Sequence, residues 1–111
     1  MAATMIAFYK EPADREAFDK HLFEVHLPLC RKLPGLVKME VNRFSGKSAP
    51  YYLMVTLYFN NKDERKDALM NSPEGQAVTA DTQSNVTPDK IVVAFADTVD
   101  VEEGSKAGIQ G

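Results

Sequence analysis

Four stretches of the chain have the residue pattern of β-strands. Between residues 36 and 44, apolar side chains (Val37, Met39, Val41) alternate with polar ones, which predicts a strand with one buried face. Between residues 51 and 59 both alternating sets are apolar or aromatic, so neither face of this strand is suited to water. The predicted strands are 4–9, 36–44, 51–59 and 91–99, and the loop 44–50, which contains Gly, Ser and Pro, joins the second strand to the third as a hairpin.

The first helix is predicted from about Asp14 to Val25. Asp14 is a suitable N-cap, and apolar residues recur after it at helical spacing and form one stripe that should face the core. Pro28 lacks the N–H that an interior helical residue donates, so the helix is expected to end or kink between Val25 and Leu27. His26 would then lie at a helix C-terminus. The residues of the stripe are Phe18, Leu22, Val25 and Leu29.

Two further helical segments are predicted after the third strand. Asn61 followed by Glu64 has the spacing of a capping box and begins a charged helix that ends near Met70. Ser72 as N-cap with proline at the first helical position begins a second helix, expected from Pro73 to about Asp81. The polar stretch 82–90 is predicted to be a loop.

The predicted order of elements is strand, helix, strand, strand, helix, strand. This order is typical of the α+β, ferredoxin-like arrangement, in which a four-stranded antiparallel sheet has helices on one face. Val55 is assigned to the helix-facing side of strand 51–59, and Met54 and Tyr58 to the other side. Because helices cover only one face, the second apolar face predicts a homodimer that closes sheet against sheet.

Composition restricts the class of protein. The 111 residues are enough for one domain, assigned to 1–100, followed by a glycine-containing tail at 101–111 that is expected to be mobile. The net charge of -3, with Lys and Arg scattered, argues against nucleic acid and anionic membranes as partners. No apolar run approaches the ~20 residues that span a bilayer. With one cysteine and no signal segment at its start, the chain is predicted to be soluble and cytoplasmic.

Histidine is the residue type that best suits proton transfer near neutral pH, and His26 is the candidate acid/base. A structural alternative is that its ring bonds a carbonyl freed at Pro28. In a regular α-helix His21 and His26 fall on opposite flanks of the apolar stripe, which makes them a poor chelating pair. No metal-ligand or nucleotide motif accompanies them, so no metal and no cofactor is predicted.

Three other side chains are candidates for contact with a ligand. Tyr9 at the end of the first strand offers a hydroxyl for a ligand carbonyl or phenol, although such a tyrosine also packs its ring. His21 is either a helix-flank residue or a ligand contact, and Tyr58 either packs in the dimer or lines a pocket. Cys30 has no catalytic partner in the sequence and is interpreted as a small apolar residue.

The helix, its proline and the following turn resemble the EthD family of small dimeric α+β barrel proteins. The resemblance rests on DKHLFEVHLPLCRKLPGLVKMEVNRF, with FYK before it and SPEGQA after it, and extends from about Met5 to Phe95. It implies a ferredoxin-like protomer, a homodimer, and a pocket between sheet and helices near the histidine. Among the matching residues, the resemblance implies a role in the site for His26 and Tyr9.

Function is restricted less than fold, because one fold supports many activities. The resemblance implies relatives attached to ether degradation, and barrels that isomerise, cyclise, dehydrate or oxygenate aromatic and polyketide-like compounds without a tightly held cofactor. We therefore expect a cofactor-independent enzyme acting on a small apolar, aromatic or lactone-like compound, with His26 as acid/base. The alternative is a non-catalytic ligand-binding or accessory protein of a degradation or biosynthesis pathway. Haem binding, by analogy with distant barrel relatives, is a third hypothesis that a visible spectrum tests.

Overall fold

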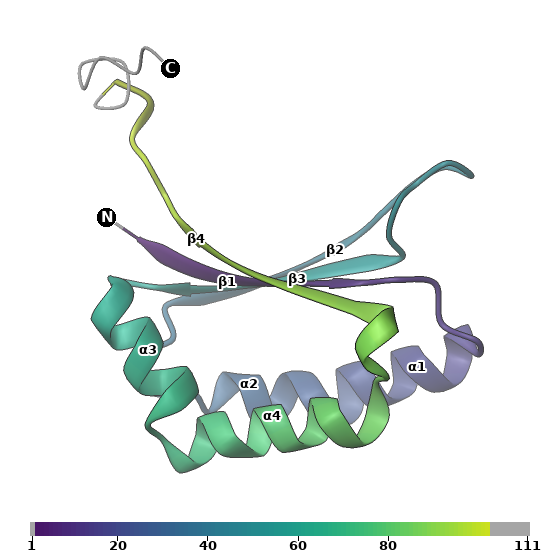
Figure 1. Ribbon diagram of the computed structural model, residues 1–111, viewed down its shortest axis with the longest axis horizontal. Helices are drawn as coiled ribbons and strands as arrows, with labels where there is room; N and C mark the ends of the chain where they lie inside the picture. The colour runs from purple at the N-terminus through teal and green to yellow at the C-terminus, as the bar shows by residue number, and fades with distance from the viewer. Residues whose placement is uncertain (1, 103–111) are drawn as a thin grey trace.

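The chain forms a four-stranded antiparallel sheet with its helices packed on one face (Figure 1). The computed structural model describes residues 2–102, so most of the predicted mobile tail at 101–111 lies outside the described residues. The sheet order is β2-β3-β1-β4, which is the ferredoxin-like arrangement that the sequence predicted. The strands are β1 (Ala3–Tyr9), β2 (Lys38–Arg43), β3 (Leu53–Phe59) and β4 (Ile91–Asp97).

The helices begin at the capping residues that the sequence indicated. The Asp14 carboxylate accepts the Ala17 N–H at 3.0 Å, and the Asn61 side chain accepts the Glu64 N–H at 2.8 Å. Ser72 accepts the N–H of Gly75 at 2.9 Å. The helical segments are α1 (Arg15–His21), η1 (Leu22–His26), α2 (Leu27–Arg31), α3 (Lys62–Met70), α4 (Pro73–Asn85) and the 3₁₀ turn η2 (Pro88–Lys90). None of the described helices is both long and apolar enough to cross a membrane.

Pro28 does not end the first helix, contrary to the prediction. α1 continues through η1, a π-helical turn in which the Leu27 N–H bonds back to the carbonyl of Leu22, five residues earlier. The chain then resumes an α-helix with Pro28 in the first turn of α2. A proline ring normally collides with the carbonyl four residues before it, and a wider turn relieves that contact. His26 therefore lies inside a continuous helical rod that extends to Arg31, and it is not at a helix C-terminus.

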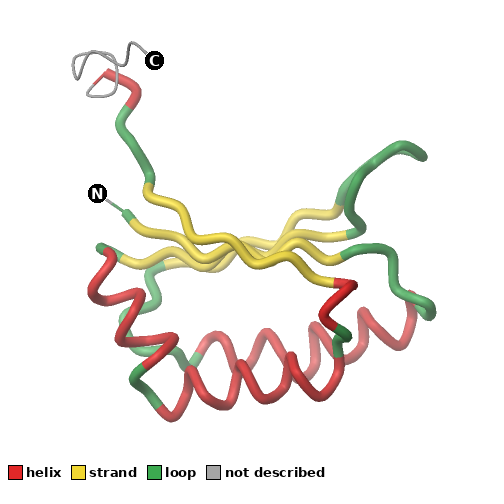
Figure 2. Tube along the Cα trace, in the orientation of Figure 1, coloured by secondary structure: helices red, strands yellow, loops and turns green. Residues whose placement is uncertain are grey.

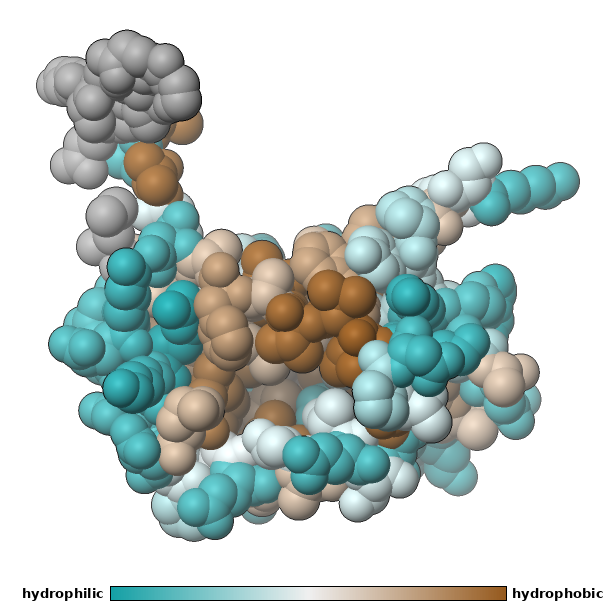
Figure 3. All heavy atoms as spheres, in the orientation of Figure 1, coloured by the Kyte–Doolittle hydropathy of each residue, from teal (hydrophilic) through white to brown (hydrophobic). Residues whose placement is uncertain are grey.

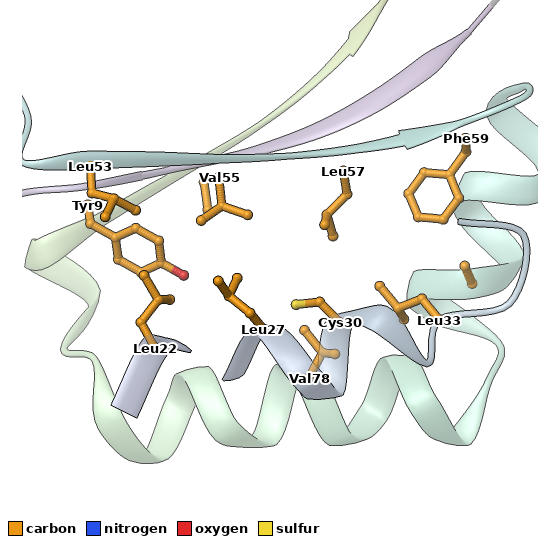
Figure 4. Close-up of a cluster of buried hydrophobic side chains, with 12 residues drawn as sticks. Tyr9, Leu22, Leu27, Cys30, Leu33, Leu53, Val55, Leu57, Phe59 and Val78 are labelled. Atoms are coloured by element: carbon orange, nitrogen blue, oxygen red, sulfur yellow. The ribbon is translucent and has the colours of Figure 1, made fainter. Parts of the chain in front are cut away.

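The π turn also changes which side chains of this rod face the core. Val25, predicted to be buried, is 42% exposed. Because the π turn shifts the helical register, a different set of residues is buried after it, and Figure 4 shows their side chains pointing at the sheet. The buried apolar residues of the rod and the turn after it are Leu22, Leu27, Cys30 and Leu33.

The register of the sheet separates its two faces. Tyr9 is paired with Leu53 and Ala7 with Val55, and alternate residues point to the same side, so these four face the helices. Figure 4 shows the β3 side chains of this set directed into the core. On the other side, in the part of the chain that the structure describes, no helix covers the sheet (Figure 2). Met54 and Tyr58 belong to that open face, as the sequence predicted.

The helix-facing position of Val55 can be tested directly. Val55 is buried in the core, so Val55→Asp places an unpaired carboxylate there, and we expect the loss of several kcal/mol of the free energy of unfolding, of the same order as the total stability of a domain. Urea denaturation followed by circular dichroism measures it. Ser45→Asp adds the same charge to the exposed hairpin loop and should leave the transition unchanged. A Val55→Asp protein that unfolds like the native one would contradict the assignment of faces.

Candidate functional site

Two histidines and one aspartate meet between the helical rod and α4. The Asp81 carboxylate lies 2.8 Å from His26 Nδ1 through its Oδ2 atom. His21 Nε2 lies 2.9 Å from the same Oδ2 and 3.0 Å from Oδ1. One carboxylate therefore accepts hydrogen bonds from both imidazole rings.

The π turn makes this convergence possible. The two histidines are five residues apart, and in a regular α-helix that spacing would direct them about 140° apart, as the sequence analysis assumed. A π turn joins residues five apart by a hydrogen bond, so it brings His21 and His26 toward the same side of the rod. π turns of this kind occur frequently at functional sites.

Asp81 is the central residue of the site and is not among the residues predicted from the sequence. We expected α4 to end there, but the helix continues to Asn85, so Asp81 lies within a complete turn. The Asn85 side-chain amide donates to Asp81 Oδ1 at 3.1 Å and to its main-chain carbonyl at 2.9 Å. A signal existed in the sequence, because Val78, Asp81 and Asn85 continue a helical spacing of three and four beyond the predicted end.

Burial and charge favour an ionised Asp81. The side chain is 13% exposed, compared with 9% for His26 and 34% for His21. Burial raises the pKa of the Asp81 carboxyl, but the hydrogen bonds and the charges of His21 and His26 outweigh it and bring the pKa below its ordinary value. Asp81 is thus a carboxylate at neutral pH and acts as an acceptor toward both rings.

The carboxylate fixes the orientation of the His26 ring. Because Asp81 can only accept, the hydrogen-bond network assigns the proton to His26 Nδ1 and leaves Nε2 with a lone pair in the neutral ring. Nε2 makes no hydrogen bond to residues 2–102, and no side-chain nitrogen or oxygen in that range is both fully buried and unpartnered. His26 Nε2 is therefore not fully enclosed by the described residues, and the ring lines two cavities from which a ligand can reach it.

Tyr9 contributes a second free polar atom. Its ring is buried at the end of β1 and packs edge-on against Phe18, with ring centroids 5.2 Å apart. Burial, followed by the charges of Cys30 and Asp81, raises the pKa of the phenol, so the hydroxyl remains a proton-bearing donor. No hydrogen bond within the described chain occupies it. Figure 4 shows this hydroxyl directed from the sheet toward the helical rod.

Two cavities meet at these residues. The first, of about 300 Å³, is lined by polar and apolar side chains that include His21, His26 and Asp81. The second, of about 290 Å³, is apolar and extends between β4 and α4, where Figure 3 shows hydrophobic side chains gathered in a hollow. Tyr9, His26 and Thr82 line both cavities. Volumes of this size, with a few convergent polar groups, are typical of small-molecule sites.

The remaining candidates lie elsewhere or serve packing. Tyr58 is on the open face of the sheet, where its hydroxyl donates to Glu40 at 2.7 Å and Lys38 lies over its ring, so it takes no part in this site. Cys30 lines the apolar cavity, and burial, followed by the charge of Asp81, raises the pKa of its thiol to about 12. It therefore stays a neutral thiol. No group of three or more His, Cys, Asp or Glu side chains within residues 2–102 is arranged to hold a metal ion.

The fold and the site together define a ferredoxin-like α+β protein with a histidine-containing pocket between sheet and helices. Residues 10–97 match the EthD domain, and the chain belongs to the EthD family. It is 31% identical to an EthD family protein from Bacillus halodurans, over 89% of this chain and 100% of that one, with a TM-score of 0.82.

More distant structures share the fold. A dimeric ferredoxin-like protein from Thermobifida fusca has a TM-score of 0.67 at 15% identity, covering 88% of this chain and 92% of that one. A second dimeric ferredoxin-like protein, from Jannaschia, has a TM-score of 0.63 at 21% identity, covering 88% and 100% of the two chains. No curated protein matches the sequence significantly.

The lowered pKa of Asp81 predicts how the site contributes to stability. A carboxyl with a folded-state pKa below its unfolded value stabilises the protein above the unfolded pKa, and the contribution is lost as the pH falls through the folded pKa. We expect Asp81→Asn to lower the free energy of unfolding at neutral pH by about 1.5–3 kcal/mol, the value of a hydrogen bond to a charged group. The deficit should shrink below about pH 4. Urea titrations at both pH values measure it, and Asp63→Asn on the exposed surface of α3 is the control.

Proposed function

We propose that this protein is an enzyme that transfers a proton within a small carbonyl- or phenol-containing compound, with His26 as the acid/base. The observation that carries the proposal is the 2.8 Å bond between Asp81 and His26 Nδ1, which leaves Nε2 without a partner at the junction of two cavities. Asp81 holds the ring in one tautomer and stabilises the imidazolium that forms when Nε2 takes a proton. Burial of the pair strengthens that effect.

The chemistry follows from the two free polar atoms. His26 Nε2 removes a proton from the carbon next to a substrate carbonyl, and the electron pair of that C–H bond moves to the carbonyl oxygen. The Tyr9 hydroxyl donates a hydrogen bond to this oxygen as its negative charge develops. The imidazolium then returns the proton to another atom of the same molecule, so no oxidant or reductant is consumed. Isomerisation, cyclisation and dehydration of a carbonyl compound share this first step.

The protein is further proposed to act as a homodimer in which the open faces of two sheets pack together. The similar proteins from Thermobifida fusca and Jannaschia are described as dimeric, which supports this assembly. On the open face, Phe8 and Met54 are half-buried without a helix above them. Burial of such side chains against a second copy is favourable. The cavities lie on the opposite side of the sheet, so the two sites of a dimer would each remain accessible.

Proton abstraction can be measured before the natural substrate is identified. In D₂O, His26 should exchange the protons next to the carbonyl of β-tetralone, a neutral aromatic ketone, and NMR follows the exchange. We expect His26→Gln to lower the protein-dependent rate by about 10²- to 10⁴-fold, because glutamine still donates to Asp81 but cannot take up the proton. His21→Gln should lower the exchange rate less, since His26 Nε2 is retained.

Two results would contradict the proposal. Exchange that is equally fast with native protein and with His26→Gln would show that His26 is not the base. Binding of β-tetralone without any protein-dependent exchange would favour the non-catalytic binding protein. An NMR titration of His26 complements the assay, because a ligand in contact with Nε2 changes the pKa of the ring, whereas a purely structural histidine is insensitive to it.

The assembly is tested by light scattering across micromolar concentrations. We expect a mass of two chains of 12.3 kDa each for the native protein. Met54→Glu places a charge on the open face and should give the monomer mass or unfold the protein, because an interfacial charge without a partner is costly to bury. Gln76→Glu, which adds the same charge at an exposed position of α4, is the control. A native protein that stays at the mass of one chain would refute the dimer.

A further inference from the structure

The apolar cavity forms a groove whose floor is set by the pairing of β1 with β4. Three steps of the register follow one another along it: Tyr9 with Ile91, Ala7 with Val93, and Met5 with Phe95. Each of these pairs lines the cavity, and α4 forms the opposite wall. The groove therefore begins at the His26 and Tyr9 site and continues along β4 (Figure 3).

The lining selects for an uncharged occupant. Among the described residues that line the groove there is no carboxylate, lysine or arginine, and His26 at its inner end is their sole basic side chain. Arg65 lies over the ring of Phe95 at the outer end. A charged group placed along these walls would lose its hydration without gaining a partner. An apolar group, in contrast, would gain by leaving water.

Three large apolar side chains of the groove are exposed in the described chain. Met70 is 67% exposed, Phe95 59% and Val93 45%, although the register places Val93 and Phe95 on the helix-facing side of the sheet. This side is opposite the open face proposed for dimerisation, so a second copy bound there would not reach the groove. The groove is instead continuous with the free atoms of His26 and Tyr9, which favours a ligand of that site as its occupant.

The register gives the length of the ligand. Met5 and Tyr9 are four residue steps apart along β1, and at the rise of an extended strand these steps span about 13 Å, which matches an extended alkyl chain on the order of ten carbons. We propose that the ligand is a neutral molecule with an unbranched apolar arm of this length, whose carbonyl lies at His26 and Tyr9 and whose arm ends at Met70 and Phe95. This inference rests on the proposed function for the position of the carbonyl.

Binding of straight-chain methyl ketones tests the inference without any need for turnover. The ketones, from pentanone to tridecanone, displace the neutral fluorescent probe N-phenyl-1-naphthylamine from the full chain. We expect affinity to rise about fourfold for each added methylene, up to a length of about ten carbons, and then to level off. A straight-chain carboxylate of the same length should bind about tenfold more weakly or worse, because its charge is desolvated near Asp81.

Val93 is the position that can shorten the groove. It lies halfway along the register and is partly exposed, so Val93→Phe adds a ring there without replacing a fully buried side chain. We expect the plateau to move to about half the native chain length while the affinity for pentanone changes less than twofold. Val37→Phe is the matched control, because Val37 is 59% exposed and lines none of the cavities described above. Its length profile should equal that of the native protein.

The outcomes separate this inference from the proposed function. If the affinity of the native protein rises with chain length without a limit, or if Val93→Phe has the same length dependence as the native protein, the groove is overturned. Neither result bears on the role of His26. If the native affinities follow the expected dependence on chain length while His26→Gln still exchanges the protons of β-tetralone, that combination supports the groove and refutes the role of His26 as the base. A Val93→Phe protein that loses the dimer mass, when Val37→Phe keeps it, would assign the groove to a second copy and overturn the inference.

Discussion

The arrangement of the site depends on one interaction: the Asp81 carboxylate accepts hydrogen bonds from two imidazole rings. It links the helical rod to α4 through hydrogen bonds of 2.8–3.0 Å, and it joins elements far apart in the sequence. The interaction requires the π turn, because only a turn that brings residues five apart together can aim both rings at one carboxylate. Pro28, which makes an uninterrupted α-helix costly at this point, gives a physical reason for that turn.

Much of the fold was predictable because its signals are local. The caps at Asp14, Asn61 and Ser72 begin the helices where the sequence indicated, and the alternation in β3 assigns Val55 and Met54 to opposite faces. Proline was the misleading signal. Proline disfavours a regular α-helix, but a helix can respond by ending or by widening one turn, and nothing local in the sequence decides between these two responses.

The candidate site was only half predictable for a related reason. His26 and Tyr9 were selected from residue type and family resemblance, and the structure brings both to one junction of cavities. Asp81 was missed because its role depends on a contact 55 residues away in sequence. His21 was judged to point away from His26 on the assumption of an α-helical period, which fails across the π turn. Tyr58 was correctly assigned to the open face, and that assignment separates it from the site.

The π turn also has an evolutionary meaning. A π turn can be regarded as a single residue inserted into an α-helix, so the loss of one residue between His21 and His26 would restore a regular helix at little cost to the fold. The two histidines would then be four residues apart, the spacing at which side chains of a regular α-helix lie on one face, so both rings would still be directed at one carboxylate. In an alignment of homologues, a one-residue gap at this point would therefore not by itself mark the loss of the pair. The replacement of either histidine or of Asp81 would mark it.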